Sequence, residues 1–499
     1  MSTTSYEFVD VLIVGAGLSG IGAACHLANE MPRTSCAILE SRPVSGGTWD
    51  LFRYPRVRSD SDMYTLGYEF APWLAEKSIA DGADILQYIR ETAESFGIAD
   101  VIRYNRRAVR AEWSSATSRW RVTVSHSDSH EESIIECGFL WGNTGYYRYD
   151  RGYRPEFPGE ENFQGKFIHP QFWPEDFDAA GQRIVVIGSG ATAMTLVPAL
   201  ATDAEQVTLL QRSPTYVAAR PDVDAVAQFL MKRLPRKMAY RVIRWKNIFG
   251  STLIYQLSRR RPEVVKEKLR EAIVEALPAG FDVDRHFSPK YNPWDQRLCL
   301  ITNGDLFEQI SKGRVEVVTD TIDHFTAEGI MTSDGNVIPA DVVVTATGLE
   351  LQFLGGMELV IDGAPCNLAD HVAYKGIMVC GVPNLAMTFG YTNASWTLKA
   401  DLTARYVCRV LKAMKRRGAT SVTPQSPDGA LSDEPYIALS AGYITRAASQ
   451  LPKQGLARPW RLYQNYFMDF WLFRLRGAGD HLEFGRASVR RDKSKAVSS

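Results

Sequence analysis

The residues best suited to chemistry in this chain are three glycines in the turn GAGLSG: Gly15, Gly17 and Gly20. They follow the β-branched apolar run VDVLIV and precede an apolar helical pattern, which predicts a strand, a turn and a helix. Gly15 allows a sharp turn, Gly17 lets backbone approach a pyrophosphate, and Gly20 permits close packing of helix on strand. The N–H groups at the helix N-terminus would face the phosphates. The turn is therefore predicted to bind a dinucleotide.

A carboxylate follows this turn at the spacing that such a site requires. Glu40 ends the run CAILE, about 20 residues after Gly20, where an acid accepts hydrogen bonds from both ribose hydroxyls. A 2′-phosphate would be repelled there. Glycine-rich turns also occur for purely structural reasons, but the strand, the helix and Glu40 together favour a nucleotide site.

A second turn of the same type lies in RIVVIGSGATAMTLVPALA, with Gly188, Gly190 and Ala193 at its three small-residue positions. The next strand, QVTLLQ, ends in Arg212 and Ser213 instead of an acid. A guanidinium and a hydroxyl suit a 2′-phosphate, although Arg212 alone could also be an ordinary surface residue. The opposite preferences of the two turns predict FAD at the first and NADPH at the second.

Two nucleotide sites imply hydride transfer from nicotinamide to flavin. A disulfide reductase would need a cysteine pair soon after Glu40, but the segment SRPVSGGTWDLFRYPRVRSDSDMYT contains no cysteine. The electrons must therefore leave by another route, and oxygen is the acceptor that we expect.

The stretch FQGKFIHPQFWP, between the two turns, carries aromatic rings where a plain linker would be small and polar. It resembles the F-x-G-x-x-x-H-x-x-x-W-P fingerprint of type I Baeyer-Villiger monooxygenases. The matching residues are Phe163, Gly165, His169, Trp173 and Pro174. The chain is similar to the subgroup that also activates thioamide prodrugs, and this resemblance implies a hinge that couples movement of the NADPH domain to the flavin site. The alternative for His169 is an ordinary core histidine.

The resemblance also implies a mechanism, in which a C4a-peroxyflavin attacks a ketone and the adduct rearranges to an ester. Arg297, in WDQRLC, matches the family's catalytic arginine, and Asp60, in RSDSD, matches the acid that orients it. An arginine suits this role because it stays charged when it is desolvated. Taken in isolation, an Arg–Asp pair is more often a structural salt bridge.

The same resemblance places further residues along the flavin. These are Gly46, Gly47, Thr48 and Trp49, with Asn393 to Trp396 near the ring system. Core packing is the rival explanation for Trp49 and Trp396. Three positions depart from the family pattern: Gln296 replaces a lysine and weakens the expected NADPH preference, Arg56 replaces a glycine, and Asn143 precedes Thr144. We expect Arg56 to alter the backbone of the loop that carries Asp60 or to require a negative φ there.

The elements around these motifs predict an α/β fold with two Rossmann-like dinucleotide-binding domains, of the glutathione-reductase-like flavoprotein type, with a helical insertion. The predicted divisions are 1–155, the first part of the FAD domain; 156–180, the hinge and fingerprint; 181–345, the NADPH domain with a helical insertion at about 223–290; 346–485, the completion of the FAD domain and the C-terminal segment; and 486–499, a disordered tail.

Composition excludes several classes of protein. Hydrophobic residues make up 45% and charged residues 23% of the 499 residues, as in an ordinary globular protein, and a net charge of zero gives no argument for nucleic acid. The seven scattered cysteines form no C-x-x-C pair, which favours a reducing cytoplasm without structural zinc or another metal site. We read no signal peptide and no apolar run of the length that spans a membrane.

Two other segments leave their role open. The basic stretch KRLPRKMAYRVIRWKN could contact an anionic membrane or a partner, but a helical insertion in the NADPH domain with a solvated basic face is the preferred interpretation. The aromatic stretch YFMDFWLFRLR could cover a substrate tunnel, form an oligomer interface or lie on a membrane. The resemblance to the family, whose C-terminal segment wraps back over the core, implies that it packs onto the enzyme.

The sequence thus predicts an NADPH- and O2-dependent monooxygenase that converts hydrophobic ketones to esters, with oxidation of sulfur compounds or thioamides as a side activity. Two alternatives stay open: an N- or S-hydroxylating flavin monooxygenase, and an uncoupled NADPH oxidase or flavin redox sensor. Trp173 and Arg297 argue against the first alternative, and Arg297 with Asp60 against the second.

Overall fold

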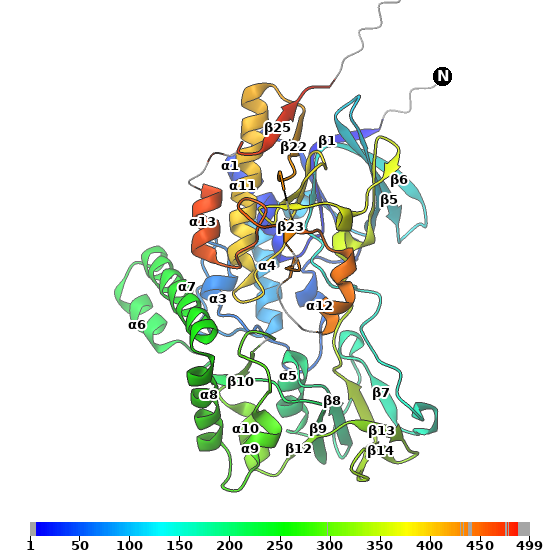
Figure 1. The fold of residues 1–499 in the computed structure, drawn as a ribbon, viewed down its shortest axis with the longest axis vertical. Coiled ribbons are helices and arrows are strands. Elements are labelled where there is room, and N and C mark those ends of the chain that lie inside the picture. The colour runs from blue at the N-terminus through cyan, green and yellow to red at the C-terminus, as the bar shows by residue number, and fades with distance from the viewer. Residues whose placement is uncertain are drawn as a thin grey trace, which may run out of the picture.

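Two β-sheets organise the two halves of the computed structural model, which describes residues 6–296, 298–429, 431–432, 434–437, 442–474, 477 and 479–487. Figure 1 shows the first sheet in the upper half with helices α1 (Leu18–Glu30) and α11 (Trp396–Arg417), and the second sheet in the lower half with α5 (Ala191–Leu200) and α10 (Asp305–Ser311). The chain leaves the first sheet after β6 (Glu132–Gly142), builds the second, and returns to the first with β17 (Glu358–Ile361).

The first sheet has nine strands, with β1 in parallel between β2 and β6. Besides β6 and β17, this sheet contains β1 (Glu7–Val14), β2 (Cys36–Leu39), β3 (Ile102–Arg103), β4 (Arg106–Ser114), β5 (Arg119–His126), β18 (Ala364–Pro365) and β21 (Leu385–Met387). The second half of β1 is a continuous apolar run because it is buried on both faces. α1 and α11 belong to the hydrophobic core on one side of this sheet.

The second sheet has five strands, all parallel, in the order β12, β9, β8, β16, β7. The bounds are β7 (Lys166–Ile168), β8 (Arg183–Ile187), β9 (Gln206–Gln211), β12 (Val315–Thr319) and β16 (Val342–Thr345). The valine- and isoleucine-rich sequences of β8 and β16 suit strands that are covered on both faces. The fingerprint segment therefore supplies an edge strand, β7, to this sheet.

Smaller elements complete the fold. The remaining strands are β10 (Val217–Arg220), β11 (Cys299–Thr302), β13 (Ile322–Phe325), β14 (Gly329–Thr332), β15 (Val337–Pro339), β19 (Ala373–Tyr374), β20 (Met378–Val379), β22 (Ser421–Pro424), β23 (Leu431–Ser432), β24 (Gln454–Gly455) and β25 (Leu482–Gly485). The remaining α-helices are α2 (Thr48–Leu51), α3 (Met63–Leu66), α4 (Gly82–Ser95), α6 (Ala225–Arg233), α7 (Arg236–Arg260), α8 (Pro262–Ala276), α9 (Val283–Phe287), α12 (Gly442–Ala447) and α13 (Tyr466–Arg474).

Helix α7 leaves the second half and packs against the first. The Tyr240 hydroxyl donates to the carbonyl of Tyr68 at 2.9 Å, and Arg244 Nη1 donates to the carbonyl of Gly67 at 2.7 Å. Arg244 Nη2 also lies 3.2 Å from Asp401 Oδ2 on α11, and both side chains are buried. Arg244 of the basic segment is therefore buried in the core. This differs from the prediction of a helix whose basic face is solvated.

The aromatic segment near the C-terminus forms α13 and packs on α11, as predicted. Lys399 Nζ lies 2.6 Å from Asp469 Oδ2, and the Tyr391 hydroxyl donates to the same oxygen at 2.7 Å. Most of the predicted tail, from residue 488 onward, lies outside the described residues. Within the described ranges, every helix is too short or too polar to cross a lipid bilayer.

Candidate active site

The first glycine turn connects β1 to α1, and its geometry leaves no room for a side chain at Gly15 or Gly20. Gly15 has φ +105°, and a Cβ there would lie 2.5 Å from the carbonyl oxygen of Asn143. A Cβ on Gly20 would lie 1.8 Å from the carbonyl oxygen of Gly15. Gly17 is the N-cap of α1, so the N-terminus of the helix opens at the turn. These close approaches explain why glycine occupies positions 15 and 20, while Gly17 leaves the backbone at the helix N-terminus bare.

Glu40 follows β2 and is buried beside the turn. Its Oε2 accepts from the N–H of Ala16 at 2.8 Å, and its Oε1 accepts from the N–H of Arg42 at 3.0 Å. Burial raises the pKa of the Glu40 carboxyl, and the two hydrogen bonds oppose that rise. The tertiary structure therefore brings Glu40 and the glycine turn together, as their spacing predicts.

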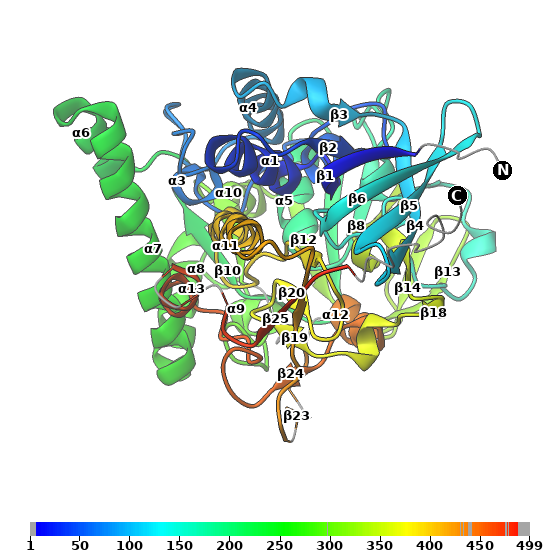
Figure 2. The same ribbon diagram turned by 90° about the horizontal axis from the view of Figure 1, so that it is seen from above.

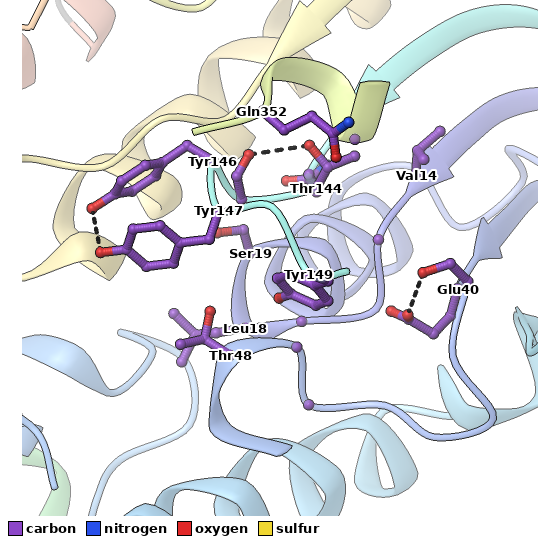
Figure 3. A pocket seen from close by; sticks show the side chains of 18 of the residues that line it. Val14, Leu18, Ser19, Glu40, Thr48, Thr144, Tyr146, Tyr147, Tyr149 and Gln352 are labelled. Atoms are coloured by element: carbon purple, nitrogen blue, oxygen red, sulfur yellow. Dashed lines mark hydrogen bonds between the residues drawn. The ribbon is translucent and has the colours of Figure 1, made fainter. Parts of the chain in front are cut away.

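A cavity of about 630 Å³ begins at this turn and extends toward α11. Figure 3 shows Glu40 at one end, Tyr146 and Tyr147 at the other, and Tyr149 between them. The predicted residues that line it are Gly15, Gly17, Glu40, Gly46, Gly47, Thr48, Trp49, Asp60 and Trp396. Asn393 instead lines a narrow groove between α7 and the segment before α11, and Ala394 lines both spaces.

The lining fits a flavin dinucleotide. Bare backbone faces the cavity at Gly15, Gly17 and Gly47, and a Cβ on Gly47 would lie 3.0 Å from the Cα of Gly17. A carboxylate closes one end, where a ribose would donate hydrogen bonds. The volume lies within the range of about 300–1,000 Å³ that is usual for cofactor sites.

The opposite end of the cavity is aromatic. The rings of Tyr146 and Trp396 stack with centroids 5.2 Å apart, and Trp396 Nε1 donates to Ser19 Oγ at 2.7 Å. Burial raises the pKa of Tyr149 to about 12. Sequence motifs did not single out these tyrosines, although they follow β6 at the carboxyl ends of parallel strands, where ligands bind in such folds.

Asp60 lies in a loop that ties the two halves together. Its side chain is exposed and lines the cavity, and Ser61 Oγ donates to its Oδ1 at 3.4 Å. Arg58 in the same loop pairs with Asp305 of α10 at 2.6 Å. Arg56 has φ +55°, so the expectation of a negative φ was wrong: the loop keeps a backbone that favours glycine, and Arg56 adopts it.

Hydrogen bonds from α7 also hold the loop that carries Asp60. Asn247 Nδ2 donates to Asp62 Oδ1 at 2.8 Å, and Asp62 caps α3 by accepting from the N–H of Thr65. Thr65 Oγ1 is hydrogen-bonded to Ser395 Oγ, immediately before Trp396. The loop of Asp60 and the segment before α11 are thus joined by buried polar side chains that sequence motifs did not indicate.

Arg297 lies outside the described residues, and its place relative to Asp60 stays a prediction. The preceding residue, Gln296, forms a bridge with Pro293, and Cys299 begins β11 with its N–H donating to the carbonyl of Tyr216 at 2.8 Å. The chain on both sides of Arg297 therefore belongs to the second half of the molecule.

The second glycine turn connects β8 to α5. Gly188 has φ +130°, and a Cβ there would lie 2.3 Å from the carbonyl oxygen of Ala346. Gly190 is the N-cap of α5, and Ala193 is buried in the helix, where its small side chain fits. Arg212 and Ser213 are exposed after β9, and Ser189 Oγ in the turn donates to the carbonyl of Ser213 at 3.1 Å. The turn and the two polar residues are therefore neighbours.

The first residues of the fingerprint are packing residues of the second half. Phe163 is buried against Phe167 and Phe325, with ring centroids 5.3 and 5.8 Å away. A Cβ on Gly165 would lie 2.4 Å from the carbonyl oxygen of Asp341, which accepts from the N–H of Lys166 at 3.0 Å. Glycine at 165 therefore lets the chain enter the edge of the sheet.

The later fingerprint residues connect this edge to the cavity. Burial lowers the pKa of His169, and hydrogen bonding to the backbone of Gly348 and Tyr153 opposes that shift. Gln171 Nε2 donates to the carbonyl of Tyr149 at 2.9 Å, so the segment is bonded to a residue that lines the cavity. Trp173 packs against the core of the second half, and the exposed Pro174 follows it.

Comparison with known proteins agrees with this geometry. Residues 77–423 match the model of the flavin-binding monooxygenase-like family, and residues 13–71 match an NAD(P)-binding Rossmann-like domain. The FAD-containing monooxygenase EthA of Mycobacterium tuberculosis is 51% identical over 470 residues, which cover 94% of this chain and 96% of the relative. EthA of Mycolicibacterium smegmatis is 52% identical over 469 residues, 94% of this chain and 95% of the relative.

A solved structure shows the same fold. An oxidized steroid monooxygenase bound to NADP superposes with a TM-score of 0.74, at 21% identity, over 96% of this chain and all of the other. The α/β fold with two dinucleotide-binding halves is therefore confirmed, and so is the resemblance found in the sequence. With its two glycine turns, Glu40 and the fingerprint segment, this chain belongs to the flavin-binding monooxygenase-like family.

Proposed function

We propose that this protein uses FAD, NADPH and O2 to convert hydrophobic ketones to esters. The balanced reaction consumes a ketone, O2, NADPH and a proton, and it yields an ester, NADP⁺ and water. FAD, when bound, supplies the transfer of electrons from NADPH to oxygen. Glu40 and the first glycine turn would hold FAD, while Arg212, Ser213 and the second turn would hold NADPH.

One observation carries this proposal: Asp60 lines the same cavity as Glu40 and the first glycine turn. An acid in the cavity lining can orient the guanidinium of Arg297, whose permanent charge would stabilise a developing oxyanion. The rings of Tyr146 and Trp396 would exclude water from that end, which strengthens such an electrostatic interaction.

The substrate class follows from the same lining. Tyr146, Tyr391 and Trp396 present mostly apolar surface, which favours a hydrophobic ketone, and a thioether or thioamide is the second candidate. For the location of the protein, we propose a reducing cytoplasm, which suits the free, buried thiols of Cys25, Cys137 and Cys408.

We also propose the domain division 1–155 and 346–485 for FAD and 181–345 for NADPH. The strands of the second sheet lie between residues 166 and 345, which supports an NADPH domain inserted into the FAD domain. The segment 156–180 would be the hinge, with β7 as the part of it that moves with the NADPH domain.

Product analysis tests this function. FAD-loaded protein receives NADPH, labelled O2 and a panel of aliphatic ketones, aryl ketones and thioethers. We expect an ester that carries one labelled oxygen. Arg297→Ala should abolish ester while FAD content and reduction of the flavin by NADPH persist, and the surface control Arg151→Ala should leave ester formation unchanged.

The other outcomes identify the competing functions. A sulfoxide without ester would indicate a hydroxylating monooxygenase. Consumption of NADPH with peroxide as the only product for every compound would indicate an uncoupled oxidase or a redox sensor. Either result contradicts the proposed ketone oxidation.

A further inference from the structure

The outer side of α7 carries an exposed apolar stripe. Met238, Val242, Trp245, Phe249 and Leu253 follow one another at intervals of three or four residues, so they lie on one side of the helix. Their exposed fractions range from 41% to 61%. At about 1.5 Å per residue, the stripe is about 22 Å long.

Neighbouring helices widen this stripe into a patch. The Trp245 ring contacts Tyr466, Phe467 and Phe470 of α13, with centroids 5.9, 6.3 and 5.8 Å away. Figures 1 and 2 both show α6 and α7 projecting from one edge of the molecule, with α13 beside α7. We call the following exposed residues the α7 patch: Val226, Phe229, Met238, Val242, Trp245, Phe249, Leu253, Phe467 and Trp471. Contiguous apolar surface on this scale commonly marks an interaction site.

The segment that supplies most of the α7 patch carries charged side chains of one sign. The sequence contains no Asp or Glu between Asp224 and Glu263, although the whole chain has a net charge of zero. Exposed cations flank the patch at both ends of α7. They are Lys232, Arg233, Arg236, Lys237 and Arg241 at one end, and Arg260 and Arg261 at the other, where Arg259 pairs with Asp295 at 2.5 Å. The surface is therefore complementary to a partner that is apolar within and anionic at its boundary.

The opposite side of α7 already has its own partners. Tyr240, Arg244 and Asn247 are buried and bonded to the first half of the molecule. The helix is thus held rigidly by one side while the α7 patch faces outward. An amphipathic helix with aromatic residues on one face and cations beside them is typical of proteins that lie in the plane of a membrane interface.

We propose that the α7 patch docks on an anionic lipid surface, with the apolar side chains among the acyl chains and the flanking Lys and Arg side chains at the headgroups. Each cation near such a surface adds to binding, and the attraction weakens with salt. The docking does not depend on the oxidation proposed above, because it uses residues outside the cavity.

Vesicle sedimentation of the FAD-loaded full chain tests the docking. We expect binding to phosphatidylglycerol vesicles at low salt, and binding weaker by about tenfold or more to phosphatidylcholine vesicles or at high salt. Phe249→Asp combined with Leu253→Asp should lower the partition coefficient by about tenfold or more. Val337→Asp combined with Leu431→Asp is the matched control, because both are exposed apolar residues, on β15 and β23, and should leave binding unchanged.

A charge-reversed pair separates the electrostatic contribution. Lys237→Glu with Arg241→Glu should weaken binding by about tenfold and flatten its salt dependence, while Lys166→Glu with Lys290→Glu, at exposed sites elsewhere, should not. FAD content and Tm of each variant confirm that it is folded.

Two results would overturn the docking. The first is equal binding to both kinds of vesicle, or binding that survives the Phe249 and Leu253 changes. The second is the absence of vesicle binding together with a fall in molar mass, measured by light scattering, when Phe249 and Leu253 are replaced. That pair of results would assign the patch to contact with a second copy of the chain.

Discussion

Arg58 donates through Nη1 to Asp305 Oδ2 at 2.6 Å and through Nη2 to Oδ1 at 3.4 Å. Only 8% and 14% of the two side chains are exposed. The pair joins the loop that carries Asp60 to α10 in the other half of the molecule. Two charges that are largely removed from water depend on each other, so the loss of one leaves the other uncompensated.

Arg58→Ala should therefore lower the free energy of unfolding by about 3–5 kcal/mol. Chemical denaturation followed by tryptophan fluorescence measures this change. Replacing both residues, Arg58→Met with Asp305→Leu, should recover most of the stability, because no unpaired charge remains. A cost below about 1 kcal/mol for Arg58→Ala would show that the pair is effectively solvated. Arg110→Ala breaks an exposed pair with Glu112 and is the matched control.

Glu40→Gln should weaken FAD binding by about 10- to 150-fold. The reason is that hydrogen bonds to a charged acceptor contribute about 1.5–3 kcal/mol, and an amide accepts more weakly. Titration of the apoprotein with FAD measures the affinity through flavin fluorescence. Glu136→Gln, which changes a carboxylate of β6 that does not line the cavity, is the control. Unchanged affinity in Glu40→Gln would remove Glu40 from the flavin site.

Arg212→Ala should raise the KM for NADPH about tenfold or more and leave the KM for NADH nearly unchanged, because only NADPH carries the 2′-phosphate. Initial rates of flavin reduction with each nucleotide give the two values. If both KM values rose together, Arg212 would contact a group that NADPH and NADH have in common. The predicted preference for NADPH would then have another source.

The lowered pKa of His169 makes stability depend on pH. Burial disfavours the imidazolium, so the unfolded chain takes up a proton near its ordinary pKa of about 6.5 while the folded chain does not. His169 therefore lowers the free energy of unfolding only below its ordinary pKa. The free energy of unfolding then falls as the pH drops toward the folded pKa, with a slope of at most about 1.4 kcal/mol per pH unit.

His169→Asn should flatten this dependence, because Asn can still accept from the N–H of Gln171 but does not titrate. Tm measured between pH 5 and pH 8, a window chosen around about 6.5, compares the variant with the original protein. His324→Asn, at an exposed histidine, should keep the original slope. An identical slope in His169→Asn would show that His169 stays solvated.

Local patterns in the sequence predicted both nucleotide turns. The spacing of Gly15, Gly17 and Gly20 is a pattern of a few residues, and Glu40 follows at the distance set by one strand, one helix and the next strand. The helical segment from residue 225 was also readable from periodicity and composition, whereas the packing of α13 was inferred from resemblance to a family. The fingerprint residues were found by resemblance to a family.

Contacts between distant parts of the chain were not predictable in this way. Arg58 and Asp305 are 247 positions apart, and Tyr146 meets Trp396 only because β6 and α11 converge on one cavity. The α7 helix was expected to belong to the second half, but Arg244 and Asn247 bond it to the first.

The sequence by itself determined the fold class, the two turns and the family, because local backbone sterics and hydrophobic periodicity are written into short segments. Only the tertiary structure decided which side of α7 is core and which is exposed, and which side chains line the cavity with Asp60. Those outcomes depend on how helices and sheets cross and pack, and local sequence patterns do not reveal which distant residues meet.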